Sequence, residues 1–376
     1  MRWLRSLGFL ASGATSVATV LALAAPAQAA YSEQPISLPW HPAGPVHSSI
    51  SRGGVVYLGG KLDGVGGIAA VDAGTGNLLW QVPANGDVRA LALSGDGTRL
   101  YAGGSFTTVR GVTRQRLVAL SVSNHNVITS WKARAGGQVR DLLARSGIVY
   151  IAGRFTTVNG VAQRGLAAVN GTTGRRVTSF RYSTDDDAFG LARSGRRLLV
   201  SGSFHRINGV ARASLAAIDL STNRLTGWAP PRLCGGCEQY FDVRTDGTNA
   251  YVATSGNAAG AFNLATGRQP WHPVRGDGDF QVLSLPGDGR VYLGGHFGRK
   301  IWTDSKDPVE ASDVAAAFTA TGQIDRTWTP RIYRVYPGTW ALTATAGRLW
   351  VGGDFAGQQA DGVNNQLPYL AAYPRV

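Results

Sequence analysis

Short apolar runs alternate with turns rich in Gly, Asp and Asn along most of this chain. A representative stretch is expected to form strands at 88–94, 100–104, 117–121 and 127–132. These runs are rich in Val, Leu, Ile and Ala, which is typical of strands joined by tight turns. A sustained apolar period of 3.6 residues, which would predict helices, is missing. The pattern therefore predicts an all-β protein of short antiparallel strands.

One motif recurs along the chain: apolar residues, then usually a Gly pair, a polar residue and Phe. Its seven copies begin at Tyr57, Tyr101, Tyr150, Leu199, Tyr251, Tyr292 and Trp350, with spacings of 41 to 58 residues. A strand-and-turn repeat of this length indicates propeller blades. We therefore expect a seven-bladed β-propeller of four-stranded antiparallel blades. The Gly residues indicate close approach of another backbone, and we expect the Phe to fill the space between blades.

The N-terminal region is predicted to complete the last blade. Fourth strands elsewhere end in Trp-x-Pro, at 228–230, 271–273 and 328–330. The last blade has its third strand at 369–373, but the same ending occurs at 40–42, in the segment 36–42. Because an open ring would expose two sheet edges, we expect the N-terminal strand to close it.

The first residues resemble a targeting segment rather than part of the fold. Arg2 and Arg5 precede an apolar stretch at 7–25, and Ala27-Gln-Ala29 suits signal peptidase cleavage. This predicts a cleaved signal peptide at 1–29, a propeller at 30–376 and a secreted, extracellular protein. A retained membrane anchor is the alternative. No later apolar run reaches the length of a membrane span.

The charge of the chain bears on its partners. The net charge is +14, and nearly all of the basic residues are Arg. Outside the cell, a basic surface can attract anionic wall polymers; alternatively, the charge is simply spread around the ring. No basic run or aromatic RNA-binding pattern predicts a specific nucleic-acid partner.

The two cysteines, Cys234 and Cys237, are separated by Gly-Gly. In an exported chain this spacing predicts a small-loop disulfide. The alternatives are zinc, which would need a second pair of ligands, and redox chemistry, which would need a strand–helix context.

Three stretches, 105–112, 154–161 and 203–210, with the trailing runs 117–120, 166–169 and 215–219, resemble the delta-sixty type of bacterial β-propeller repeat. The resemblance covers nearly all of the mature chain. It implies a secreted or surface-displayed propeller and no family-wide catalytic residues. The stretch 70–80 also resembles the repeat of pyrroloquinoline-quinone enzymes. The resemblance to that family would imply an eight-bladed ring with adjacent cysteines and a calcium site. This chain departs from that pattern, with seven copies of the motif and Cys-Gly-Gly-Cys, so we expect no quinone cofactor.

Common catalytic motifs are missing: there is no G-x-S-x-G, H-E-x-x-H or P-loop. In a propeller, the loops entering each first strand ring the mouth of the channel. Aligning the repeats places one position of these loops at Pro45, Asp87, Gln138, Asp186, Cys237, Asp279 and Gly338. Two positions further on lie His47, Arg89, Arg140, Ala188, Gln239, Gln281 and Trp340.

Two longer loops, 298–312 and 331–336, are expected on the same face, where long loops commonly bind ligands. The candidate ligand-binding residues are His47, Asp87, Arg89, Arg140, Asp186, Asp279, Arg334, Tyr336 and Trp340. Asp87, Asp186 and Asp279 are also candidate calcium ligands, because calcium prefers several oxygens. The alternative is that these Asp residues only begin turns.

These observations favour a secreted, non-enzymatic β-propeller that recognises a glycan or a cell-surface protein through the channel mouth. One alternative is a polysaccharide-acting lyase or hydrolase, or a quinone-type enzyme, which would need acid and base groups converging on the channel. A purely structural envelope protein is another.

Overall fold

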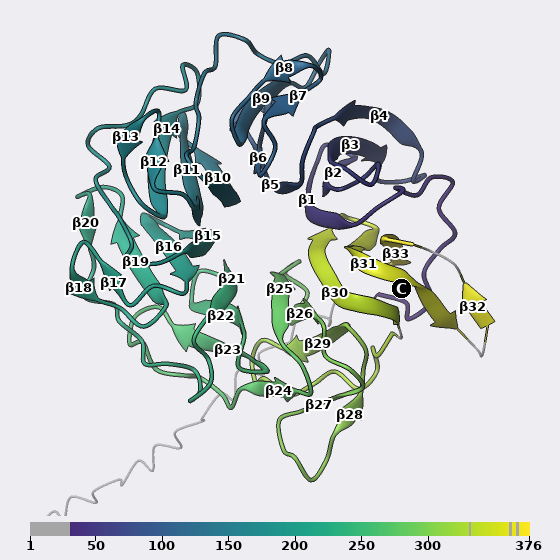
Figure 1. Cartoon of the computed structure of the whole chain (residues 1–376). Helices are drawn as coiled ribbons and strands as arrows, with labels where there is room; N and C mark the ends of the chain where they lie inside the picture. The colour runs from purple at the N-terminus through teal and green to yellow at the C-terminus, as the bar shows by residue number, and fades with distance from the viewer. Residues whose placement is uncertain (1–30, 331, 361–362, 366–367) are drawn as a thin grey trace, which may run out of the picture.

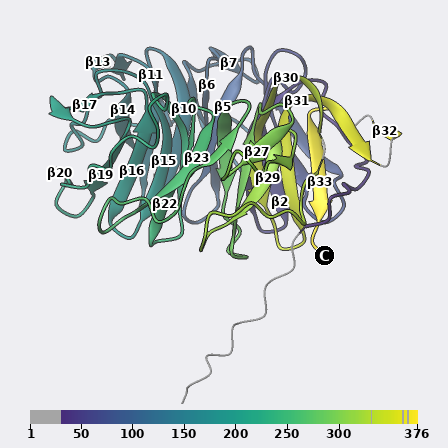
Figure 2. The ribbon, with the colours of Figure 1, turned by 90° about the horizontal axis from the view of Figure 1, so that it is seen from below.

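The computed structural model describes residues 31–330, 332–360, 363–365 and 368–376, and the predicted signal peptide lies outside them. The described residues form antiparallel β-sheets and contain no helix, so none that could cross a membrane. The sheets are arranged around a common centre (Figure 1) and stand side by side in one layer (Figure 2). The predicted all-β class is confirmed.

Each sheet begins with its innermost strand and proceeds outward. The first comprises β1 (Val46–Arg52), β2 (Val55–Gly60), β3 (Gly67–Asp72) and β4 (Leu78–Pro83). Two three-stranded sheets follow: β5 (Val88–Leu93), β6 (Arg99–Gly104) and β9 (Leu117–Ser121), then β10 (Gln138–Arg145), β11 (Ile148–Arg154) and β14 (Leu166–Asn170). Next comes a sheet of β15 (Ala188–Ser194), β16 (Arg197–Gly202), β19 (Leu215–Asp219) and β20 (Arg224–Leu225).

The remaining sheets follow the same plan. One comprises β21 (Tyr240–Thr245), β22 (Asn249–Thr254), β23 (Ala258–Asn263) and β24 (Val274–Gly276), and it is extended by β27 (Lys300–Trp302) and β28 (Val309–Glu310). Another comprises β25 (Phe280–Ser284), β26 (Arg290–Gly295) and β29 (Val314–Phe318). In the last, β31 (Arg348–Ala360) pairs with β30 (Ile332–Ala344), β33 (Leu370–Pro374) and the short β32 (Val363–Asn365).

The predicted fourth strand is regular in only some of the sheets. Elsewhere a single bridge takes its place, as between Leu120 and Val127. The chain turns away there because Trp131 leaves the sheet and is fully buried, with its indole nitrogen donating to the carbonyl of Asn170 at 3.2 Å. Packing of the Trp between sheets therefore replaces ladder hydrogen bonds.

The predicted polar loops after the motif contain small hairpins: β7 (Thr108–Val109) with β8 (Val112–Thr113), β12 (Thr157–Val158) with β13 (Val161–Ala162), and β17 (Arg206–Ile207) with β18 (Val210–Ala211). The turn of the second hairpin, Asn159-Gly160, has positive φ at both residues, as a two-residue hairpin turn requires.

The predicted close approach of a backbone is confirmed for the second Gly of the pair, whereas the first Gly meets a side chain of the next sheet. A Cβ on Gly104 would collide with the carbonyl oxygen of Asp87, and one on Gly103 would collide with the side chain of Val139 in the next sheet. Phe106, which follows, is fully buried. Each buried core cluster joins residues of two adjacent sheets, so the core lies between sheets.

The N-terminal segment lies along the outer edge of β33. The amide of Ser32 donates to the carbonyl of Pro374 at 2.7 Å, and that of Ile36 to Ala372 at 2.9 Å. Leu38 is buried in the same cluster as Ala372.

Candidate functional site

Each innermost strand carries a β-bulge at an equivalent place, directly after its first residues in β1, β5, β10, β15, β21 and β25, and at Trp340 in the longer β30. In β1, for example, the pairing shifts between Val46 and Ser48. A bulge leaves one residue out of the ladder and re-aims its side chain. The bulged residues are His47, Arg89, Arg140, Phe189, Phe241, Gln281 and Trp340.

All of these bulged residues line one cavity of about 440 Å³. Several neighbours touch. The His47 and Trp340 ring centroids lie 5.9 Å apart, and those of Phe189 and Phe241 lie 5.8 Å apart. The guanidinium carbon of Arg140 lies 5.5 Å from the Phe189 ring centroid. The cavity wall therefore has a basic arc, formed by His47, Arg89 and Arg140, followed by an aromatic one.

The predicted alignment is shifted in two repeats. The structure places Phe189 and Phe241 in the cavity wall at the positions assigned to Ala188 and Gln239. Two residues before these Phe residues lie Asp187 and Gln239. Their backbone carbonyls accept the same hydrogen bond that the carbonyl of Asp87 accepts in its own repeat. In these two repeats, the residues equivalent to Asp87 are therefore Asp187 rather than Asp186, and Gln239 rather than Cys237.

Asp87 lies beneath the basic arc and holds two of its members. Its carboxylate oxygens lie 2.6 Å from His47 Nδ1 and 2.7 Å from Arg89 Nε, and its side chain is 5 % exposed. Burial alone would raise the pKa of Asp87, but the hydrogen bond and charge of His47 and the charge of Arg89 hold it below the ordinary value. Asp87 therefore positions the two basic side chains.

The other two candidate Asp residues have different surroundings. Asp186 lines the cavity with 48 % of its side chain exposed, 3.7 Å from Arg164 Nη2. Asp279 accepts a hydrogen bond from the amide of Asn257 at 3.3 Å and is not among the residues that line the cavity. In the described part of the chain, no three His, Cys, Asp or Glu side chains form a group that could hold a metal. The geometry thus gives no support to calcium binding by these three residues.

The two long loops differ from the expectation. The insertion at 298–312 forms β27 (Lys300–Trp302) and β28 (Val309–Glu310), and β27 pairs with β24 of the neighbouring sheet. Its residues do not line the central cavity. Arg334 and Tyr336 belong to β30, and their side chains lie outside the described part of the structure.

Three residues deeper in the cavity were not predicted from the sequence: Asp141, Asp242 and Arg244. Asp141 directly follows the bulge of β10, and Asp242 follows that of β21. Each could have been found only by recognising the bulge, since each otherwise looks like a strand residue.

The two deep carboxylates join neighbouring sheets. Asp141 accepts hydrogen bonds from the amides of Leu142 and Leu191, both at 2.8 Å. Asp242 does the same with the amides of Val243 and Leu283, both at 2.8 Å.

Burial dominates the titration of both carboxyls. It raises the pKa of Asp141 to about 6, a shift that nearby Asp242 favours and the charge of Arg244 opposes. Burial also raises the pKa of Asp242, against the charge of Arg244.

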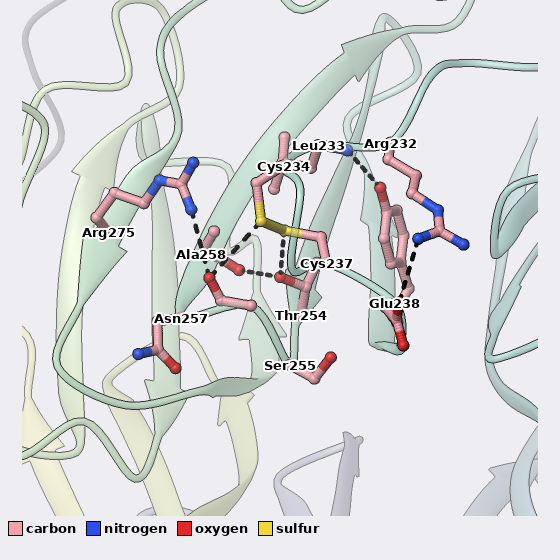
Figure 3. The surroundings of a disulfide bond; sticks show 12 residues. Arg232, Leu233, Cys234, Cys237, Glu238, Thr254, Ser255, Asn257, Ala258 and Arg275 are labelled. Carbon is pink, nitrogen blue, oxygen red and sulfur yellow. Dashed lines mark hydrogen bonds and ion pairs between the residues drawn. A yellow bond between two sulfur atoms is a disulfide. The ribbon is translucent and has the colours of Figure 1, made fainter.

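The predicted disulfide between Cys234 and Cys237 is present (Figure 3). Cys237 is fully buried, and its sulfur accepts a hydrogen bond from the Thr254 hydroxyl at 3.2 Å. Gly256 stands where five of the other repeats have Phe and the first has Leu62, and a Cβ there would lie 2.6 Å from Cys234 Sγ. The disulfide loop therefore occupies the place of the missing Phe.

Comparison with known proteins identifies the fold. No family model and no curated protein matches the chain. Among solved structures, it is similar to U3-55K, with a TM-score of 0.60 and 11 % identity over 90 % of this chain and 97 % of that one. It is also similar to the WD40 β-propeller domain of Doa1, with a TM-score of 0.55 and 10 % identity over 89 % and 94 %. The computationally designed Ika8 protein gives a TM-score of 0.52 and 12 % identity over 90 % and 98 %.

At such identities the likenesses concern the fold alone. Together with the antiparallel sheets, they define the class: an all-β, propeller-like protein.

Proposed function

We propose that this protein is a secreted, non-enzymatic seven-bladed β-propeller that binds a glycan or a cell-surface protein at the mouth of its central cavity. The observation that carries the proposal is the set of bulged side chains that line a single cavity. Repeated bulges aim polar, basic and aromatic groups at one point, and ligand sites use such a mixture.

Several contacts support seven blades and a closed ring. β1 lies against both β5 and β30, so the first sheet neighbours the second and the last. The hydrogen bonds of Ser32 and Ile36 to β33 give the last sheet an outer edge from the N-terminal segment. On this proposal, the N-terminal segment completes the final blade.

Export and family membership are proposed on sequence grounds. The signal-like segment at 1–29 and the delta-sixty-type resemblance both favour secretion. The disulfide suits an oxidising compartment. The net charge of +14 favours anionic wall polymers among the partners.

An enzyme acting on a polysaccharide is the second candidate, and one observation favours it. Asp141 lines the cavity with its pKa raised to about 6, in the range of a general acid. Its two oxygens, however, both accept backbone hydrogen bonds, which suits a structural role. Release of new reducing ends or unsaturated products from an acidic polysaccharide, abolished by Asp141→Asn, would favour the enzyme.

Trp340 provides the test of the binding face. We expect the purified mature protein to retain a ligand on a glycan array or among extracellular proteins. Replacing Trp340 by Ala should weaken that ligand by more than about 1 kcal/mol, as truncation of an aromatic anchor does. The control is Arg196→Ala, in the turn between β15 and β16 at the opposite end of the strands. If the Arg196 change weakens binding and the Trp340 change does not, the wrong face has been assigned.

A further inference from the structure

Arg140 differs from the other arginines of the cavity. Arg89, Arg154 and Arg244 each form an ion pair with a carboxylate of their own. Arg140 makes no ion pair within the described part of the chain, and its buried Nε has no hydrogen-bond partner there. Its guanidinium lies over the Phe189 ring.

The surroundings of Arg140 make its charge unfavourable in the unliganded protein. Burial, together with the charges of Arg89 and Arg154, lowers its pKa to about 10, although the charges of Asp187 and Asp87 oppose this shift. A buried charge without a partner costs free energy. An oxyanion placed beside Arg140 would remove that cost and form a charge-assisted hydrogen bond.

The charge balance limits how negative the ligand is. Four arginines line the cavity (Arg89, Arg140, Arg154 and Arg244), and four aspartates oppose them (Asp141, Asp186, Asp187 and Asp242). Asp87, beneath Arg89 and His47, adds a further carboxylate. The arginines around the cavity are therefore already balanced by carboxylates, and Arg140 is the lining arginine that has no carboxylate of its own among the described residues. A single carboxylate on Arg140 fits this balance better than a phosphate dianion or a polyanionic segment.

The rest of the lining suits a hydroxylated ring. Gln281 Oε1 and Trp340 Nε1 are buried without a hydrogen-bond partner in the described residues, so one can accept from a hydroxyl and the other donate to one. Phe189, Phe241 and Trp340 supply apolar surface, and a cavity of about 440 Å³ accommodates a small ligand.

We propose that the cavity binds an acidic sugar, with the carboxylate of a uronic acid on Arg140 and the sugar hydroxyls on the polar lining residues. This inference rests on the proposed function and names the class of ligand. It places ligand recognition inside the cavity rather than on the peripheral loop at 298–312.

The experiment compares D-glucuronate with D-glucose, which has the same ring but a neutral group in place of the carboxylate. Each is titrated into the full mature protein at constant ionic strength and followed by calorimetry and ligand-observed NMR. Acetate and inorganic phosphate serve as anions without a sugar ring. We expect glucuronate to bind at least tenfold more tightly than glucose, acetate or phosphate.

Variants assign the effect to Arg140. Arg140→Gln should weaken glucuronate binding at least tenfold, whereas Arg140→Lys, which keeps the charge, should retain part of the affinity. Arg196→Gln removes the same charge at the opposite end of the strands and should change the affinity less than twofold. Circular dichroism and the melting temperature check that each variant is folded, and the Lys variant keeps the test decisive if the Gln variant is not.

Three results would overturn the inference: equal affinity for glucose and glucuronate, equal affinity for acetate or phosphate, or no loss in folded Arg140→Gln. These results are separable from failure of the proposed function. If glucuronate does not bind but Trp340→Ala still weakens a ligand found by screening, only the ligand class is wrong. If glucuronate binds at Arg140 but Trp340→Ala leaves every screened ligand unaffected, the binding-face proposal is wrong.

Discussion

Glycine at the second strands of the sheets illustrates how single residues set the spacing of this fold. Gly104 lies so close to the backbone of Asp87 that no side chain fits, and the equivalent Gly60 lies equally close to Pro45. The motif is therefore a packing requirement as well as a repeat signature. It also explains why the second strands could be predicted from the sequence, since a Gly pair inside an apolar run usually marks a strand that another backbone approaches closely.

We predict that Gly104→Ala lowers the free energy of unfolding by about 3 kcal/mol, because the added methyl group would overlap a backbone oxygen. Gly95→Ala is the matched control. Gly95 lies in an exposed turn with open space around its Cβ position, so its replacement should change stability by less than about 1 kcal/mol. Urea unfolding measures both. Equal effects of the two changes would contradict the packing argument.

Asp141 is expected to link stability to pH. Its pKa is about 6 in the folded protein and about 3.8 when unfolded, so the folded state binds more protons between these values. Its contribution to stability therefore falls as pH rises from about 4 to 6. The stability advantage of the wild type over Asp141→Asn should shrink over this window by roughly 2–3 kcal/mol.

Asp219 provides a control of opposite sign for this measurement. Hydrogen bonds from the Ser221 hydroxyl and from the amides of Thr222 and Ser221 lower its pKa to about 2. The stability that it contributes is present above its unfolded value and is lost as pH falls towards 2. The advantage of the wild type over Asp219→Asn should thus grow as pH rises from about 2 to 4. A pH-independent difference for Asp141→Asn would show that its carboxyl titrates normally.

At the scale of the element, the first strands show where sequence reasoning stops. Strand positions follow from apolar runs and turns, but the register of the first strands was shifted in two repeats. The turns between the first and second strands vary from two residues (195–196) to five (94–98), so the Gly motif does not fix the register of the first strand. The bulges add one residue that no apolar pattern reveals. Phe189, Phe241, Asp141 and Asp242 were missed for these reasons, whereas His47, Arg89, Arg140 and Trp340 were found.

At the scale of the element, the loop closed by the disulfide fills the space that a side chain fills in other repeats. The repeat that has Gly256 in place of the large apolar residue is the one with Cys234 and Cys237, and the loop that they close packs against Gly256. We predict that replacing both cysteines by Ser lowers the free energy of unfolding by about 2 kcal/mol or more. Closure of a small loop contributes about 2 kcal/mol, and two polar hydroxyls would take the place of the packed sulfurs.

Thiol titration of the purified, denatured wild-type protein provides the direct check on this bond. No free thiol is expected. Two free thiols would show that the cysteines are reduced, and the stability change of the double variant would then have to come from packing alone.

At the scale of the whole molecule, the N-terminal segment is the part on which the proposed closed ring depends. Within residues 36–42, Leu38 is buried, and Ile36 and Trp40 pack against the same core cluster. Together these side chains contribute roughly 3–6 kcal/mol of burial energy. Removing residues 36–42 should expose the edges of the last sheet and lower the melting temperature by about 10 °C or more, since each kcal/mol corresponds to a few degrees in a protein of this size.

A point variant makes the same test without deleting chain. Ile36→Pro removes the amide that donates to Ala372, whereas Ile36→Ala keeps it. The Pro variant should melt below the Ala variant. If the deleted protein melts like its parent, the ring does not depend on the N-terminal segment.

The bulge in each innermost strand separates two roles: the ladder hydrogen bonds hold the sheet together, and the bulged side chain faces the cavity. A bulged residue takes no part in the ladder, so its identity can change while every strand keeps its partners. Positions such as Phe189, Phe241 and Gln281 are thus open to drift or to laboratory selection without a matching change elsewhere. A library randomised at these bulges should contain mostly folded members, and a single scaffold could yield binders of unrelated specificity.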